Sequence, residues 1–227
     1  MHVDEAIRSR KSVRRFLPTP VPEAVVRHIL SVAARAPSGN NVQPWRVYAL
    51  AGEQRARLCR AIVTSATDDP DRHQPEYAYY PTQWFEPYLD RRRRCGFGLY
   101  GTLGIERDDM AARQQQMLRN YSFFDAPVGM LVTLDRRLNT GSFMDVGMFI
   151  QNILIAARGQ GLHTCAQAAF AWYHKIAREH LPMDDREILV CGVALGHEDT
   201  RAPENAFITE RAEPGEFVSF HGFDGAA

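Results

Sequence analysis

The chain has 227 residues, of which 45% are hydrophobic and 24% charged, values typical of a soluble globular protein with a substantial core. Its 27 basic and 27 acidic residues give a formal net charge of zero, which excludes a global field that would draw the protein to nucleic acid or to an anionic membrane. The first eleven residues are polar, and no apolar run of membrane-spanning length occurs. We therefore expect a cytoplasmic protein with no nucleic-acid or membrane partner.

The four cysteines are far apart in the sequence and lack C-x-x-C spacing. The eight histidines likewise show no H-E-x-x-H or other ligand spacing. We expect free thiols, no disulfide framework and no metal site. Cys165 has no evident partner that would stabilise a thiolate, so we interpret it as a small buried residue.

Hydrophobic periodicity predicts the first elements in order. Residues 23–35 carry apolar side chains at helical spacing behind a proline that suits a helix start. A loop of small and polar residues covers 36–44, and a strand follows at 45–50. A short helix is predicted at 53–62.

The segment 64–107 shows little periodicity. It is polar to about residue 81, and a helical stretch at 84–94 then ends in four arginines. Residues 96–101 match G-x-G-x-x-G, but they follow arginines rather than an apolar strand, so we interpret them as a flexible loop and not as a dinucleotide-binding turn. The aromatics and arginines of 84–100 leave two interpretations open: a lid over a flat substrate, or an ordinary helix with its arginines in solvent.

The second half predicts a core built around one apolar helix. Residues 144–158 are apolar on most sides, which places this helix in the protein's centre or in a subunit interface. No repeat or linker divides the chain, so residues 1–227 are expected to form a single domain. The other predicted elements are helices at 108–120 and 174–180 and strands at 128–134, 162–166 and 188–195.

Arg10, Ser12 and Arg14 alternate along the chain near the N-terminus. In an extended segment all three side chains would point to the same side. Two guanidinium groups and a hydroxyl suit a phosphate dianion, because charge-assisted bidentate hydrogen bonds are strong. Taken alone, however, this segment favours the interpretation as a solvated basic run.

A second motif, A-P-S-G-N-N-V-Q-P-W, occupies residues 36–45 and leads into the predicted strand. Together, R-x-S-x-R and P-S-x-x-N-x-Q-P-W resemble the nitroreductase family of flavin mononucleotide (FMN) enzymes. This chain departs from the family at residues 64–107, a segment that is longer and richer in arginine than in compact members. Further matches in the family's order lie at 123–127, 145–152, 167–170, 192–196 and 209–212.

The resemblance implies an α+β fold, a nitroreductase-like mixed β-sheet flanked by helices, in an intertwined homodimer whose FMN is touched by both chains. Residues 64–107 would be a variable cap or insert. Arg10, Ser12 and Arg211 would bind the phosphate, and Arg14 would lie at the N1 and O2 edge of the flavin. The implied cofactor-binding residues are Arg10, Lys11, Ser12, Arg14, Pro37, Ser38, Gly39, Asn41, Gln167, Ala168, Ala169 and Arg211.

Two groups of these residues would contact the ring. The loop from Pro37 to Asn41 would reach in from the other subunit. Backbone N–H groups of Ala168 and Ala169 would face flavin N5 and O4. A fixed cation such as Arg14 would stabilise the negative charge of a reduced flavin.

The resemblance further implies an enzyme that takes hydride from NADH or NADPH and reduces a nitroaromatic, quinone or related acceptor at the same face, in ping-pong fashion. The flavin performs the chemistry, so no catalytic side chain is assigned. Two alternatives stay open, since one fold hosts many activities. One is a same-fold enzyme for a non-nitro substrate, such as dehalogenation or flavin breakdown; the other is a flavin-binding protein without turnover.

Overall fold

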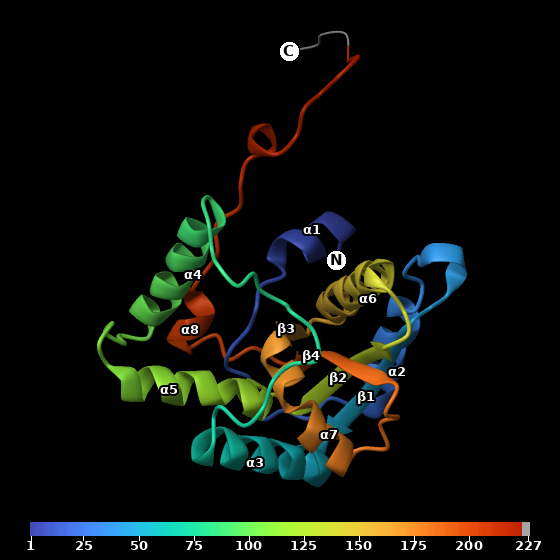
Figure 1. Ribbon diagram of the computed structural model, residues 1–227. Helices are drawn as coiled ribbons and strands as arrows, with labels where there is room; N and C mark the ends of the chain where they lie inside the picture. Colours follow the sequence, from blue (N-terminus) through green and yellow to red (C-terminus); the bar gives the residue numbers. More distant parts are fainter. Residues whose placement is uncertain (224–227) are drawn as a thin grey trace.

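The computed structural model describes residues 1–223 and has a four-stranded sheet at its centre. The strands lie in the order β1-β2-β4-β3 (Figure 1). β2 and β4 are buried along almost their whole length, as expected for central strands covered on both faces. Their bounds are β1 Trp45–Ala51, β2 Val128–Asp135, β3 His163–Gln167 and β4 Glu187–Gly196.

The expected mixed sheet is wrong in its strand directions. All three strand pairs are antiparallel. Within residues 1–223 the parallel pairing is confined to an isolated bridge between Ser12 and Thr164. Apolar runs reveal where strands lie, but they carry no information on the direction in which a strand enters the sheet.

Helices cover both faces of this sheet (Figure 1). α2 (Glu23–Ala33) and α6 (Thr140–Gly159) pack on one face, and α3 (Gly52–Asp68) and α7 (His174–His180) on the other. Both faces present apolar side chains because alternate residues of a strand point in opposite directions. The remaining helices are α1 (Val3–Ser9), α4 (Tyr88–Thr102), α5 (Met110–Leu118) and α8 (Pro203–Ala206), with 3-10 turns η1 (Gly39–Asn41), η2 (Arg119–Asp125), η3 (Ala168–Tyr173) and η4 (Pro214–Glu216).

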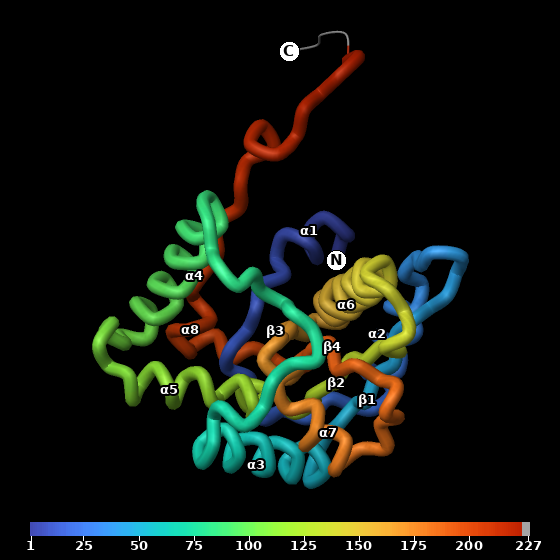
Figure 2. The backbone as a smooth tube through the Cα atoms, in the orientation of Figure 1, coloured from blue at the N-terminus to red at the C-terminus, as the bar shows by residue number. Residues whose placement is uncertain are grey.

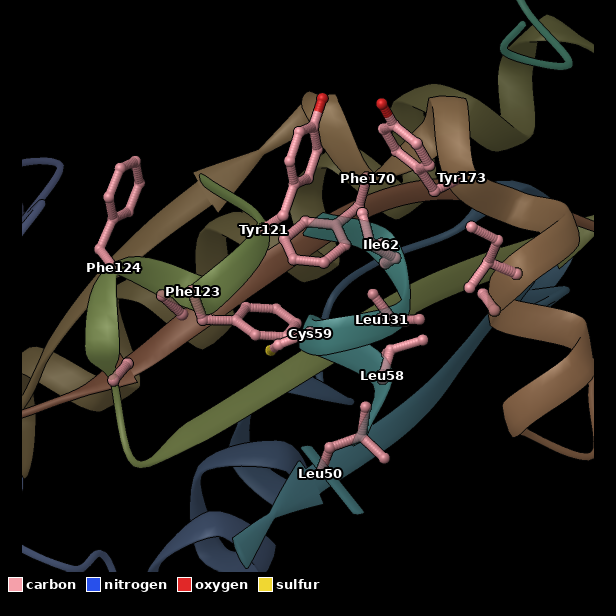
Figure 3. Packing of buried hydrophobic residues seen from close by; sticks show 14 of the residues in the cluster. Leu50, Leu58, Cys59, Ile62, Tyr121, Phe123, Phe124, Leu131, Phe170 and Tyr173 are labelled. Carbon is pink, nitrogen blue, oxygen red and sulfur yellow. The ribbon is translucent and has the colours of Figure 1, made fainter. Parts of the chain in front are cut away.

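The core on the α3 side contains a close pair of aromatic rings (Figure 3). Phe123 and Phe170 stack with ring centroids 4.3 Å apart. They lie over Gly129 of β2 and Gly192 of β4, where an added Cβ would come within 2.4 and 2.3 Å of the rings, respectively. Glycine at these two positions is what lets the aromatic layer reach the sheet.

The predicted loop at 96–101 is wrong, because these residues are helical and belong to α4. Gly98 explains the difference: a Cβ there would lie 2.3 Å from the ring of Phe207. The glycine therefore permits close packing between a helix and the C-terminal segment, although glycine weakens a helix interior. α1 was not predicted, and α3 continues six residues past the predicted end at 62.

α6 is only partly covered in the single chain. Five of its residues are buried, but Met144 and Met148 are 67% and 40% exposed. Among residues 1–223 it is the one helix that is long and apolar enough to cross a membrane by length and composition. Here it packs against β2, β3, α1 and α2 instead.

The chain after α8 leaves the body of the molecule as an extended arm (Figure 2). Large apolar side chains along this arm are exposed, among them Ile208, Phe217 and Phe220 at 76%, 69% and 68%. Such side chains on an arm without cover of its own are typical of a segment that packs on another molecule.

Candidate functional site

A cleft of about 840 Å³ lies between the two ends of the chain, a size within the range of small-molecule sites. Residues 10–12 form its N-terminal wall, and residues 208–211 form its C-terminal wall. Its floor comes from β3 and α6. Its lining includes Arg10, Lys11, Ser12, Gln151, Thr164, Ala166, Thr209 and Arg211.

The N-terminal wall is extended, as predicted. Ser12 bridges to Thr164 of β3, and the backbone N–H of Val13 donates to the carbonyl oxygen of Thr164 at 3.1 Å. Val13 is fully buried and Phe16 is 3% exposed. Because side chains alternate along an extended segment, burial of Val13 turns its neighbour Ser12 toward the cleft.

Two of the cations that line the cleft, Arg10 and Arg211, lack carboxylate partners among the described residues. Burial lowers the pKa of Arg10, and the nearby charge of Arg211 lowers it further. Within the described part of the chain, neither guanidinium forms an ion pair; that of Arg211 donates only to Thr209 and to the carbonyl of Glu210. Two cations that repel each other without a counter-ion form a site suited to an anion such as phosphate.

Two other predicted residues of this segment have partners of their own. Lys11 Nζ lies 2.7 Å from Glu198 Oε1 and donates to the carbonyl oxygen of Asn205 at 2.7 Å. Arg14 Nη1 donates to the carbonyl oxygen of Ser12 at 3.2 Å, and Arg14 is not among the residues that line the cleft. Their contacts with a cofactor remain predictions.

An apolar cavity of about 620 Å³ adjoins the cleft, and Ala166 lines both. Tyr77 forms one of its sides, with its ring 5.2 Å from that of Phe143 and its hydroxyl donating to the carbonyl oxygen of Val190 at 2.6 Å. Ala168 also lines this cavity. The arrangement offers a charged end for an anion and an apolar end for a flat ring, with the end of β3 between them.

Residues 167–169 lie where β3 becomes η3. Ala168 and Ala169 are the first two residues of η3, so their backbone N–H groups have no acceptor inside that turn. Gln167 is 3% exposed, and its Nε2 donates to the carbonyl oxygen of Asn120 at 2.7 Å. That bond ties the end of β3 to η2.

The loop from Pro37 to Asn41 does not meet the cleft within one chain. Gly39 donates its N–H to Asp145 at the start of α6, whereas Arg158, near the other end of α6, contacts Ser9 beside the cleft. Within the described chain, residues 37–41 line neither the cleft nor the apolar cavity. Contact of this loop with a cofactor therefore remains a prediction.

Cys165 is 4% exposed, and burial raises the pKa of its thiol. The interpretation as a small buried residue agrees with this environment. Its neighbour Thr164 is 2% exposed, and its Oγ1 finds no hydrogen-bond partner within residues 1–223. An unsatisfied hydroxyl beside the cleft is a feature that a bound polar ligand or water would relieve.

The aromatics of 84–100, for which a lid was one of the two interpretations left open, do not line either cavity. Instead, the guanidinium carbon of Arg92 lies 5.0 Å from the ring centroid of Trp84. The ring centroids of Trp84 and Tyr80 are 5.4 Å apart. The aromatic residues that do line the apolar cavity, Tyr77, Tyr79 and Phe143, were not predicted. Tyr77 and Phe143 are in contact. Their only sequence signal was their residue type, because the contact between them joins segments 66 residues apart.

The geometry above agrees with comparisons to known proteins. The model of the nitroreductase family matches residues 7–197. The nitrobenzene nitroreductase of Ectopseudomonas oleovorans is 41% identical over 218 residues, 96% of each chain. A 4-nitrobenzoate reductase of Nocardioides sp. is 41% identical over 220 residues, covering 96% of this chain and 89% of the relative.

Among solved structures, the FMN and NADPH-dependent nitroreductase NfnB from Sphigopyxis sp. strain HMH superposes with a TM-score of 0.95 at 35% identity, over 98% of this chain and 100% of that one. Similarity of this extent covers both the cleft and the apolar cavity. With the family model spanning most of its length and a cation-lined cleft at the end of β3, this chain belongs to the nitroreductase family.

Proposed function

We propose that this protein is an FMN-dependent oxidoreductase that takes hydride from NADH or NADPH and reduces nitroaromatic compounds. The observation that carries the proposal is the pair of carboxylate-free guanidinium groups of Arg10 and Arg211 in a cleft that continues into an apolar cavity. The family and the activities named for its relatives, reduction of nitrobenzene and of 4-nitrobenzoate, support the same conclusion.

The residues present fit FMN. Arg10, Ser12 and Arg211 would hold the phosphate, and the N–H groups of Ala168 and Ala169 would orient the ring edge. When bound, FMN supplies hydride exchange. Burial raises the pKa of Tyr77, so this hydroxyl stays neutral and shapes the cavity rather than moving a proton.

The proposed assembly is a homodimer with two shared cofactor sites. Within the described residues, the loop Pro37–Asn41 does not line the cleft of its own chain. A partner subunit would bring its loop to the cleft, and exposed Met144 and Met148 would find cover. Pro37, Ser38, Gly39 and Asn41 are proposed to contact the partner's flavin, and Lys11, Arg14 and Gln167 the flavin of their own chain.

A cofactor and turnover assay tests this function. We expect the purified protein to release FMN on denaturation and to oxidise NADH or NADPH when nitrobenzene or 4-nitrobenzoate is added. Arg10→Ala should lower FMN affinity about tenfold or more, because a charge-assisted contact to the phosphate is lost. Arg27→Ala, which removes an exposed guanidinium paired with Glu23 on α2, is the matched control.

Three results would contradict the proposal. The purified protein could release FAD in place of FMN, or it could bind no flavin after reconstitution. It could also bind FMN but fail to oxidise NADH or NADPH with every acceptor in the panel. Quinones and halogenated aromatics in the same panel separate nitro reduction from other reactions of the fold.

A further inference from the structure

Asn205 is a buried residue of α8 that binds the segment forming the N-terminal wall. It is 2% exposed. Its Oδ1 accepts from the backbone N–H of Arg14 at 2.7 Å, and its Nδ2 donates to the carbonyl oxygens of Arg15 at 2.8 Å and Asp199 at 3.0 Å. Its own carbonyl oxygen accepts from Nζ of Lys11 at 2.7 Å. All hydrogens of this side-chain amide are therefore used to hold backbone in place.

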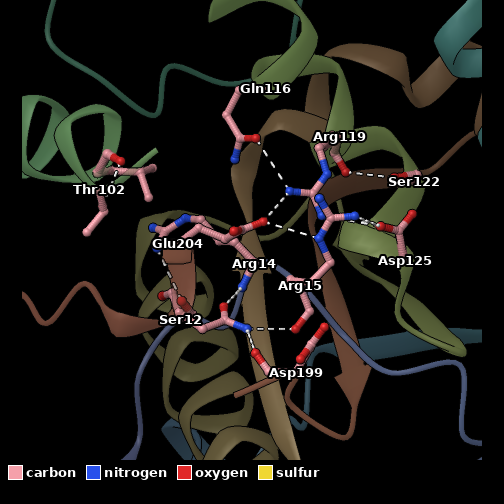
Figure 4. Close-up of polar contacts among 12 residues, drawn as sticks. Ser12, Arg14, Arg15, Thr102, Gln116, Arg119, Ser122, Asp125, Asp199 and Glu204 are labelled. Atoms are coloured by element: carbon pink, nitrogen blue, oxygen red, sulfur yellow. Dashed lines mark hydrogen bonds and ion pairs between the residues drawn. The ribbon is translucent and has the colours of Figure 1, made fainter. Parts of the chain in front are cut away.

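The same short helix leads directly into the C-terminal wall, which begins three residues after Asn205. α8 is itself fixed to the body through its neighbour Glu204, 2% exposed (Figure 4). Oε1 of Glu204 lies 2.6 Å from Nη1 of Arg119 and 3.2 Å from Nε of Arg15. One buried element thus sets the position of both walls.

The walls need such a restraint because they repel each other. Arg10 and Arg211 are cations on opposite walls, and the charge of Arg211 lowers the pKa of Arg10. Without an anion between them, this repulsion favours separation of the walls. A binding site whose groups are already held in place loses less conformational entropy when the ligand arrives.

We propose that Asn205 is a positioning residue for the phosphate of the flavin, an inference that rests on the proposed FMN site. Asn205 does not line the cleft; it acts by keeping the segment of Arg10 and Ser12 at a fixed spacing from Arg211. Because Asn205 also accepts from the backbone N–H of Arg14, which is proposed to contact the flavin ring, its loss should weaken contacts with both parts of the cofactor, and those with the phosphate more strongly.

Comparison of FMN with riboflavin tests this, because the two ligands differ only in the phosphate. Dissociation constants are measured for both by fluorescence titration of the flavin-free protein and its Asn205→Ala variant. We expect FMN binding to weaken about tenfold or more, as for a lost charge-assisted contact, and riboflavin binding to weaken by a clearly smaller factor. Asn152→Ala is the control: it removes an amide that donates to the carbonyl oxygen of Ala33 and should change neither.

Thermal unfolding of the flavin-free variants shows whether they fold. If Asn205→Ala does not, Asn205→Ser retains a hydroxyl toward the backbone and provides the same comparison. Equal weakening of both flavins, or unchanged FMN affinity, would overturn the role of Asn205. A wild-type protein that binds FMN no better than riboflavin would instead remove the phosphate site itself, and the proposed function with it.

Discussion

His163 begins β3 next to the cleft and is a half-buried neutral imidazole. Burial lowers its pKa to about 4, and the charge of Arg158 adds to this effect. Arg158 Nη1 lies 3.0 Å from its Nε2, and Glu198 lies 3.1 Å away. The carboxylate of Glu198 raises the pKa, whereas Lys11 and His197 lower it, so the Glu198 contact is no ion pair at neutral pH.

This residue makes folding sensitive to mild acid. In the unfolded chain His163 takes up a proton near its ordinary pKa of 6.5, whereas the folded chain resists protonation until about 4. Stability is therefore lost as pH falls through this window, by about 2 kcal/mol at pH 4.5. Urea unfolding of wild type and His163→Asn at pH 7.5 and 4.5 measures it. An identical pH dependence in both proteins would contradict the assignment.

The sequence predicted the position of a site residue correctly where the local backbone conformation alone determines the direction of its side chain. Alternation in an extended segment is enough to place Arg10 and Ser12 on one side, and the structure puts both at the cleft. It could not find Asn205, whose partners are about 190 residues away in sequence. Nor could it show that Lys11 is paired with Glu198. Such contacts exist only after the two chain ends meet.

At the level of elements, the segment that departs from the family is fastened at its start by Glu76. This carboxylate contacts Arg136 at 2.8 Å, Arg178 at 3.1 Å and His174 at 3.4 Å. Burial alone would raise the pKa of Glu76, but these basic groups lower it overall. Glu76 is therefore ionised at neutral pH and fixes the residue that follows it, Tyr77, in the apolar cavity.

Glu76→Gln should loosen this side of the cavity. We expect KM for a nitroaromatic acceptor to rise several-fold while FMN content stays unchanged, since Glu76 lies outside the phosphate cleft. Steady-state kinetics with 4-nitrobenzoate and flavin analysis measure the two effects. Glu53→Gln, which breaks an exposed pair with Arg60, is the control. Loss of flavin together with activity, or unchanged KM, would contradict a role confined to the cavity.

Element prediction was accurate where a single period dominates. α2, α6, α7 and all four strands lie within a few residues of their predicted positions because their buried faces repeat along the chain. α4 was misplaced, with its glycines assigned to a loop, because its helical form depends on contact of Gly98 with a distant phenylalanine. Among the helices, α6 was the one whose apolar faces were predicted to need cover from the protein's centre or from a second subunit.

Three of the surfaces that expose large apolar side chains within residues 1–223 lie on α6, on α1 and on the C-terminal arm. The outer side of α6 exposes Met144 and Met148, α1 exposes Val3 and Ile7, and the C-terminal arm exposes large apolar side chains. α1 and α6 are in contact. A dimer that covers them would also supply the loop that its own chain holds away from the cleft. Cofactor binding should therefore be linked to association.

Met148→Glu tests this linkage. A carboxylate in a buried interface would lose its hydration without a partner, so association should weaken strongly. We expect light scattering to show monomers and the FMN content per chain to fall, because each site loses the loop contributed by its partner. Met117→Glu is a matched control: Met117 is 39% exposed on α5, against 40% for Met148. It should leave both mass and flavin content unchanged. A folded Met148→Glu monomer with full FMN occupancy would show that each site is complete within one chain.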